Sequence, residues 1–165
     1  MRIFIWYLRP ITIKKPMKAQ FQKLDRILSK QMRKIGIPAL RISFAIIFVW
    51  FGVLKPLGLS PAEGLLKQTV TWLPFGSPEV WLHVIGYWEI IIGICFLFKK
   101  TSRIAIALLF LQMAGTFMPL IFLPEVTYQN GNPFTLTLEG QYIIKNVLII
   151  SGALVIGGDF YRSKK

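Results

Sequence analysis

Four long apolar runs dominate the pattern of hydrophobic and polar positions along the chain. They cover residues 37–57, 80–98, 104–123 and 141–157. A helix rises 1.5 Å per residue, so a run of roughly 17 residues or more can cross the hydrocarbon core of a bilayer. These runs mostly lack the polar residue at every third or fourth position that marks a soluble amphipathic helix. We therefore predict an all-α, polytopic membrane four-helix bundle occupying residues 37–158.

A different pattern precedes the first run. Apolar side chains recur from residue 17 at three- and four-residue steps, and Lys and Arg fill the positions between them. This periodicity predicts a basic amphipathic helix lying on the membrane interface, within an N-terminal segment covering residues 1–36. Pro38 suits the first turn of a separate following helix. We favour a topology determinant without a partner over a docking surface for this segment, because attraction to the membrane surface alone accounts for the pattern.

Charge is distributed unevenly around the apolar runs. The chain of 165 residues carries 20 Lys and Arg against 7 Asp and Glu, a formal net charge of +13. The basic residues concentrate before Gly36, at 99–103 and in a tail at 159–165, whereas the two other connections are acidic or nearly uncharged. The positive-inside bias then predicts that both termini are cytoplasmic. No aromatic-and-basic recognition motif accompanies the charge, which argues against nucleic-acid binding.

The connections on the opposite side carry helix and turn signals. Ser60-Pro61-Ala62-Glu63 has the pattern of a capping box followed by a short helix, and Ser77-Pro78-Glu79 is a start signal for the second span. Asn130-Gly131 separates a β-prone stretch from the alternating residues 134–138, which favours a small hairpin. We therefore expect short, ordered outer loops.

Glu89 lies in the middle of the second apolar run. A carboxylate at the centre of a membrane helix costs about 2.5–3.5 kcal/mol on insertion scales, so it normally requires an internal partner. Lys55, His83 and Lys145 approach from the outer side, and Arg41 from the other. Depth slightly favours Lys145 or Lys55, because long lysine stems can reach inward.

Small and polar residues share helix faces with these groups. Gly86 and Gly93 flank Glu89 at three- and four-residue steps. Comparable candidates for helix packing or a polar interior on the other spans are Gly52, Gln112, Gly115, Thr116, Pro119, Asn146 and Gly152. Two interpretations stay open, because such groups either join helices through hydrogen bonds or form a ligand or proton site.

Several short motifs, in this order along the spans, resemble a known family. They are Leu40-Arg41-Ile42-Ser43, Trp50-Phe51-Gly52-Val53-Leu54-Lys55, Ser60-Pro61-Ala62-Glu63, Gly86-Tyr87-Trp88-Glu89-Ile90-Ile91-Ile92-Gly93 and Leu138-Glu139-Gly140-Gln141-Tyr142-Ile143-Ile144-Lys145-Asn146. From Arg41 to Gly158 the chain resembles the DoxX-like superfamily, nearest to its YkgB-type branch. The resemblance implies a small protein of the bacterial inner membrane, in a superfamily linked in part to oxidoreductase complexes or oxidative-stress resistance. It also marks Lys55, Glu89, Lys145 and Asn146 as matching recurrent polar motifs.

Several chemistries can be excluded from this chain acting alone. With one cysteine, Cys95, and one histidine, His83, it cannot build a zinc site, a bis-histidine haem or an iron–sulfur cluster. No phosphate-binding glycine motif is present, so a nucleotide cofactor is unsupported. We expect no catalytic residue, no metal and no firm cofactor, although a quinone is compatible with the polar spans.

Two classes of function remain. The favoured one is a noncatalytic component that anchors or regulates a membrane complex, with the bilayer, a membrane or peripheral protein, or a second copy of the chain as partner. The alternative is a redox-linked subunit that binds a quinone or other lipophile between helices, with Glu89 exchanging protons. A small oligomeric transporter is a weaker third possibility, because four helices without an evident repeat would need to assemble.

Overall fold

The structure, a computed structural model, describes residues 15–71 and 73–162. The chain divides into two compact units, Met1–Gly36 and Ile37–Lys165. Residues 1–14 of the predicted N-terminal segment and residues 163–165 of the predicted basic tail lie outside the described part.

Helix α1 (Lys15–Leu54) runs through the described part of the first unit and on into the second. The predicted start of a new helix near Pro38 is wrong, because Pro38 lies inside α1. A proline removes only its own N–H from the helical ladder, so helical backbone can continue on both sides of it. The amphipathic segment and the first apolar run therefore form one continuous helix.

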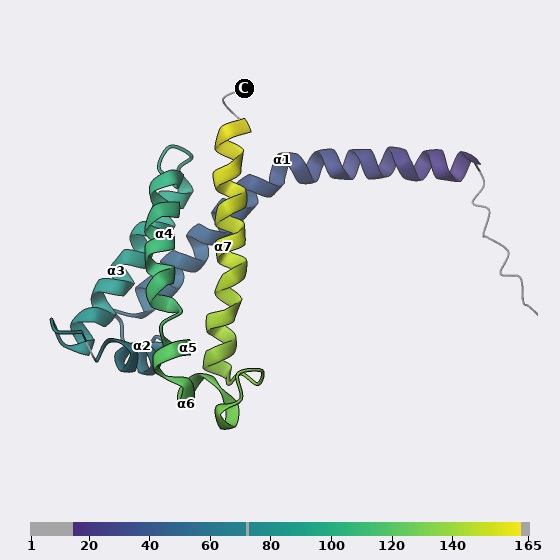
Figure 1. The fold of residues 1–165 in the computed structure, drawn as a ribbon. Helices are drawn as coiled ribbons and strands as arrows, with labels where there is room; N and C mark the ends of the chain where they lie inside the picture. Colours follow the sequence, from purple (N-terminus) through teal and green to yellow (C-terminus); the bar gives the residue numbers. More distant parts are fainter. Residues whose placement is uncertain (1–14, 72, 163–165) are drawn as a thin grey trace, which may run out of the picture. The chain divides into compact units, whose positions relative to one another are not determined.

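The second unit contains the rest of α1 and the remaining helices (Figure 1). They are α2 (Glu63–Val70), α3 (Pro78–Leu97), α4 (Ser102–Thr116), α5 (Pro119–Phe122), α6 (Pro124–Thr127), the 3₁₀ helix η1 (Gln129–Gly131) and α7 (Leu138–Arg162). Four helical stretches, Ala19–Leu54, Pro78–Leu97, Ser102–Phe122 and Leu138–Phe160, each contain a segment long and apolar enough to cross a membrane. The described residues form no β-strand. The predicted all-α fold with four spans is confirmed.

Helix boundaries follow local signals in two of the spans. The Ser77 hydroxyl accepts a hydrogen bond from the Val80 amide at 3.4 Å and caps α3, as its start signal predicts. The third span, predicted as one run, breaks at residues 117–118, and Pro119 begins the short helix α5. Proline is favoured in the first turn of a helix, where its missing N–H costs nothing. The C-terminal end of this span therefore consists of short helical segments.

The connections are ordered, but two of their predicted motifs are wrong. Ala62, not Ser60, is the N-cap of α2 and no side-chain cap bond forms; the Ser60 hydroxyl instead accepts from the Ala62 amide at 3.3 Å. Pro61 and Ala62 form a turn first, so the helix begins too late for a capping box. In place of a hairpin, a single antiparallel bridge joins Tyr128 to Leu136, because α6 and α7 begin or end too close to it for strands to extend.

The core of the second unit lies where α1 packs against α3 and α7. The Phe44 ring meets the Phe96 ring edge to face, with 5.1 Å between centroids. Around them lie the other buried residues of the core, Ala45, Phe48, Ile92, Ala105, Leu109, Met113, Ala153 and Ile156. The buried side chains come from all four long helices, so one core holds the four spans together.

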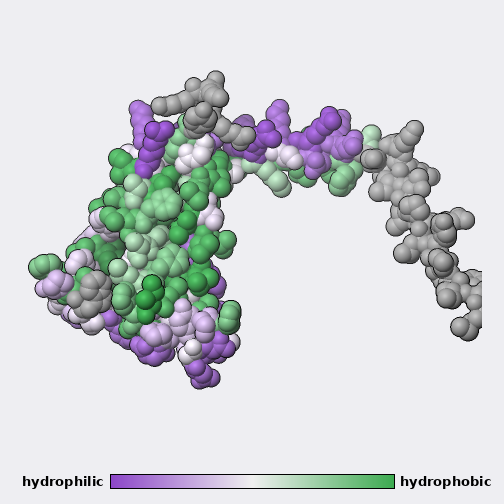
Figure 2. Space-filling view, in the orientation of Figure 1, coloured by the Kyte–Doolittle hydropathy of each residue, from purple (hydrophilic) through white to green (hydrophobic). Residues whose placement is uncertain are grey.

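Large apolar side chains also cover the outside of these helices. Figure 2 shows a hydrophobic band over α3, α4 and α7 between more hydrophilic ends. Leu148 on α7 and Ile121 on α5 are both 75% exposed. Such a surface is too extensive for a monomer in water, whereas hydrocarbon chains cover it without penalty. The exposed apolar band thus agrees with a multi-pass membrane protein.

Candidate functional site

Glu89 forms an ion pair with Lys55 and accepts a hydrogen bond from Gln112, whose Nε2 lies 2.8 Å from Glu89 Oε1. Lys55 lies in the turn directly after α1, Glu89 in the middle of α3 and Gln112 on α4. The side chains of Lys55 and Glu89 are only 7% and 12% exposed. Three separate elements therefore converge on one buried carboxylate.

A close approach of two backbones brings Lys55 to Glu89. A Cβ added to Gly86 would lie 2.9 Å from the Gly52 carbonyl oxygen and 2.9 Å from Lys55 Cβ. A Cβ added to Gly52 would lie 2.8 Å from the Gly86 carbonyl oxygen. Real Cβ atoms do not approach so closely, so only glycine at both positions allows this contact. The backbone of Lys55 then lies close enough to α3 for its side chain to reach Glu89.

The rest of the same face of α3 packs in a similar way. A Cβ at Gly93 would lie 2.8 Å from the Val49 amide nitrogen and 2.9 Å from the Ala45 carbonyl oxygen. On α7, a Cβ at Gly152 would meet the Phe44 ring at 2.7 Å. Gly52, Gly86, Gly93 and Gly152 therefore each lie at a close contact between helices.

Gly115 does not pack against a helix, contrary to its predicted role. A Cβ added there would meet nothing within 4 Å, and the residue lines a cavity. The turn of α4 that carries Gly115 faces this space, so the absence of a side chain there widens the cavity and brings no helix closer.

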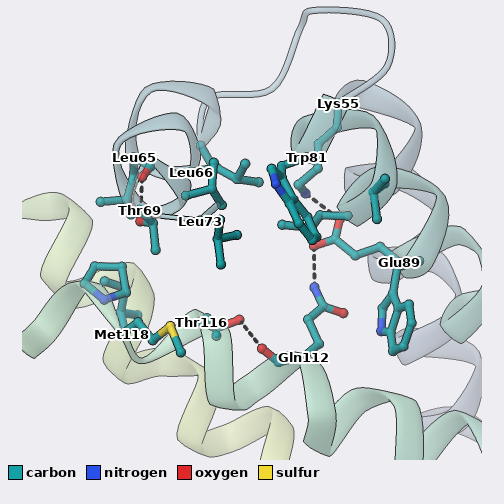
Figure 3. Close-up of a pocket in the computed structure, with 18 of the residues that line it drawn as sticks. Lys55, Leu65, Leu66, Thr69, Leu73, Trp81, Glu89, Gln112, Thr116 and Met118 are labelled. Carbon is teal, nitrogen blue, oxygen red and sulfur yellow. Dashed lines mark hydrogen bonds and ion pairs between the residues drawn. The ribbon is translucent and has the colours of Figure 1, made fainter. Parts of the chain in front are cut away.

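The cavity has a volume of about 490 Å³ and lies beside the Glu89 cluster (Figure 3). Its walls are mainly apolar and come from α2 and the segment after it, α3, α4 and α5, with Leu65, Leu66, Leu73 and Trp81 among the labelled side chains. Lys55, Glu89 and Gln112 form its most polar wall. A largely apolar space with a few convergent polar groups is the usual character of a small-molecule site.

Gln112 is held in place by its own helix and by the acid. The Thr116 hydroxyl donates to the Gln112 carbonyl at 3.1 Å, and Trp88 Nε1 donates to the Leu108 carbonyl one turn earlier at 3.2 Å. Because Nε2 donates to Glu89, the side-chain oxygen faces elsewhere; it is buried and has no hydrogen-bond partner among the described residues. An unsatisfied buried acceptor is costly, which indicates that the bond to Glu89 determines this orientation.

The other predicted partners of Glu89 lie elsewhere. Arg41 donates to the carbonyls of Phe96 and Leu97 at 3.2 and 2.9 Å, and so caps the C-terminal end of α3. A cation at this end of a helix satisfies free carbonyls and complements the helix dipole. Arg41 therefore caps α3 and does not contact Glu89.

Lys145, Asn146 and His83 are also outside the cluster. Lys145 is exposed, with its Nζ 5.5 Å from the centroid of the Tyr142 ring. Asn146 Nδ2 donates to carbonyls of its own helix, and His83 Nδ1 lies 2.7 Å from the Glu79 carbonyl oxygen. Depth in the bilayer could not exclude these residues, because it does not indicate which way each helix face is turned.

The role of α2 as a wall of the cavity does not follow from the sequence pattern. Five residues of this region face the space at helical spacing, namely Leu65, Leu66, Thr69, Val70 and Leu73. This periodicity was the available signal, but it does not distinguish a helix covering a cavity from one lying on the membrane surface.

An ionic bridge connects α2 to the start of α3. Lys67 Nζ lies 2.8 Å from Glu63 on its own helix and 3.2 Å from Glu79. The hydrogen bond to Glu63, followed by the one to Glu79, raises the pKa of Lys67 above its usual value. The bridge therefore persists at neutral pH and weakens as the pH rises through this raised value. Because all three side chains are partly open to solvent, the contribution of the bridge to stability is small and is screened by salt.

The geometry limits the chemistry that this site can perform. Within residues 15–71 and 73–162, no three His, Cys, Asp or Glu side chains come together as metal ligands would. The cluster offers a carboxylate that accepts hydrogen bonds, an ammonium group that donates them and an apolar space for the rest of a ligand. Comparisons with protein-family models, with curated proteins and with solved structures found no match to this chain.

Proposed function

We propose that this membrane protein binds a small lipophile with a polar head, such as a quinone, in the cavity beside Glu89. The observation that supports this most strongly is the position of a paired, buried carboxylate at the wall of an apolar cavity of about 490 Å³. Pockets of roughly 300–1,000 Å³ accommodate drug-sized ligands. The apolar walls would surround the ring or chain, and the polar wall would contact the head.

The ion pair suggests how such a ligand would be recognised. Lys55 can donate to a carbonyl oxygen of the head, and Glu89 can accept from a hydroxyl or exchange a proton with it. Because the pair is neutral overall, it suits an uncharged polar head better than a free ion. In this proposal Glu89 and Lys55 contact the ligand, whereas Gln112 orients the carboxylate.

Extraction of bound lipid tests the proposal. Wild-type protein purified in mild detergent should release a lipophile that is detectable by absorbance and mass spectrometry, and Glu89→Gln should release much less. Gly115→Phe should abolish binding, because the new ring would enter the open space beside residue 115. Gly158→Phe is the matched control, since residue 158 also has open space beside it but does not line the cavity. Wild-type protein that is consistently empty would contradict the proposal.

A noncatalytic role as an anchor or regulator in a membrane complex is the second candidate. The ordered outer helices and the exposed amphipathic part of α1 support it, because both offer surface beyond the spans. An empty protein that copurifies with one defined partner would favour this role over lipophile binding. The transporter function is weaker, since the cavity is lined mainly by α2, α3, α4 and α5 and is not enclosed by all four spans.

We also propose that the chain is a DoxX-like protein of the YkgB-type branch, located in the bacterial inner membrane with both termini in the cytoplasm. The order of the motifs and the basic residues at 99–103 support this assignment. Reporter fusions test the orientation: a fluorescent protein at the C-terminus should fold and fluoresce, whereas alkaline phosphatase fused there should be inactive. The reverse result would overturn it.

A further inference from the structure

The N-terminal part of α1, residues 19–36, has two chemically distinct faces. Its apolar face repeats at three- and four-residue steps and consists of Phe21, Leu24, Leu28, Met32 and Ile35. Its basic face follows a similar period and consists of Lys23, Arg26, Lys30, Arg33 and Lys34. Figure 2 shows hydrophilic and hydrophobic colours on opposite sides of this helix. The segment is therefore strongly amphipathic.

The apolar face is not used by packing within the described part of the chain. Phe21 and Met32 are each 70% exposed, and Leu24, Leu28 and Ile35 are also classed as exposed. An apolar stripe of this length is unfavourable in water, so another apolar medium has to cover it. The segment contains one acid, Asp25, which leaves its strong positive charge almost uncompensated.

We infer that residues 19–36 form a docking helix for the anionic surface of a lipid bilayer. The apolar face would enter the acyl-chain boundary, and the cations on the other face would remain among phosphate-bearing headgroups. Only a bilayer surface supplies a hydrophobic layer and a layer of negative charge along the whole segment. A nucleic acid would pair with the cations but leave the apolar face in water. This inference is independent of the proposed lipophile site.

The continuity of residues 19–36 with a membrane-spanning segment supports lipid as the binding partner of this helix. Residues 19–54 belong to one helix, the latter part of which is apolar enough to cross a bilayer. The docking segment is therefore tethered at a membrane surface, where its effective concentration toward lipid is high. Even modest attraction per residue then suffices to hold it there.

Fluorescence of the full chain in lipid nanodiscs tests the inference. In a Cys95→Ser background, Leu28→Cys carries an environment-sensitive dye on the apolar face, and Gln22→Cys carries the same dye on the polar side as a control. In discs containing phosphatidylglycerol, the Leu28-position dye should shift to shorter emission wavelengths and resist a neutral water-soluble quencher. In pure phosphatidylcholine it should be less protected, and the Gln22-position dye should stay accessible in both.

A charge series identifies the cause of the protection. Lys30→Gln combined with Arg33→Gln should lower the docked-to-free ratio in anionic discs about fivefold for each cation removed. Exchanging the same residues as Lys30→Arg and Arg33→Lys should preserve docking, because the charge is kept. Equal accessibility of the Leu28-position dye in both lipids would overturn the inference. So would protection that appears only after RNA or a protein partner is added.

Discussion

At the residue scale, the central feature is a buried carboxylate with two donors, one from the turn after α1 and one from α4. Glu89 pairs with Lys55 and accepts from Gln112 at 2.8 Å. Removing two charges from water is costly. Their mutual attraction offsets this cost only when further hydrogen bonds satisfy the remaining lone pairs and protons of both groups. The same pair replaced as a unit can be nearly neutral, whereas removal of one member leaves an uncompensated charge.

We predict strong energetic coupling between Lys55 and Glu89. Lys55→Met alone should lower the free energy of unfolding by about 3–5 kcal/mol, because it leaves the acid buried without its cation. In a Glu89→Gln background the same substitution should cost much less, since no charge is stranded. Reversible unfolding in mild detergent, measured for all four proteins of the cycle, gives the coupling energy.

Lys145→Met provides the matched control for this cycle. Lys145 is exposed and contacts the Tyr142 ring, so its coupling to Glu89 should be close to zero. A coupling of Lys145 to Glu89 as large as that of Lys55 would contradict the pairing in the structure.

Part of this cluster could be predicted from the sequence and part could not. Glu89 stands out because any acid in the middle of an apolar run requires a partner, and both of its partners are among the polar residues of the spans. The choice of Lys55 over Lys145 depends on how the helices are rotated, which the contact between Gly52 and Gly86 determines. Periodicity along single helices does not contain that information.

At the element scale, the packing of α1 against α3 depends on glycines at facing positions. We predict that Gly86→Ala lowers the free energy of unfolding by about 1–3 kcal/mol, because the new methyl group would lie 2.9 Å from the Gly52 carbonyl oxygen and backbone must move. Gly115→Ala is the control, and it should be neutral or stabilising by up to about 1 kcal/mol, since open space surrounds that position.

Thermal unfolding followed by circular dichroism in detergent distinguishes the two glycine variants. Equal stability of the Gly86→Ala and Gly115→Ala proteins would contradict the prediction that close packing at Gly86 makes its substitution costly. Lys55 offers a second readout, because a displaced α1 should also weaken its bond to Glu89 and reduce the coupling energy described above.

The spans were easier to predict than their ends. Long apolar runs determine the four helices, because length and composition alone decide whether a helix can cross a bilayer. The continuity of α1 through Pro38 and the break before Pro119 could not be deduced in the same way, since proline is compatible with both a first turn and a helix interior. The structure around each proline decides whether the helix continues through it, as at Pro38, or begins at it, as at Pro119.

At the scale of the whole molecule, the exposed apolar band determines how the protein behaves in solution. Residues such as Ile121, Leu148 and Leu111 are more than half exposed along the spans. We predict that the purified chain stays monodisperse in detergent or nanodiscs and aggregates when the amphiphile is removed, as size-exclusion chromatography would show. A chain that remained dispersed and monomeric in plain buffer would contradict a membrane-spanning fold.

The order of Lys55, Glu89 and Gln112 along the chain has a consequence for biosynthesis. Lys55 precedes Glu89 by 34 residues, and Gln112 follows it by 23. A ribosome therefore releases the cation before the acid and the amide last. Glu89 can enter the translocon after Lys55 has been synthesised. Gln112 adds its hydrogen bond to the carboxylate only once α4 emerges. Truncated nascent chains ending between α3 and α4 should accordingly insert α3, but with Lys55 alone holding the carboxylate.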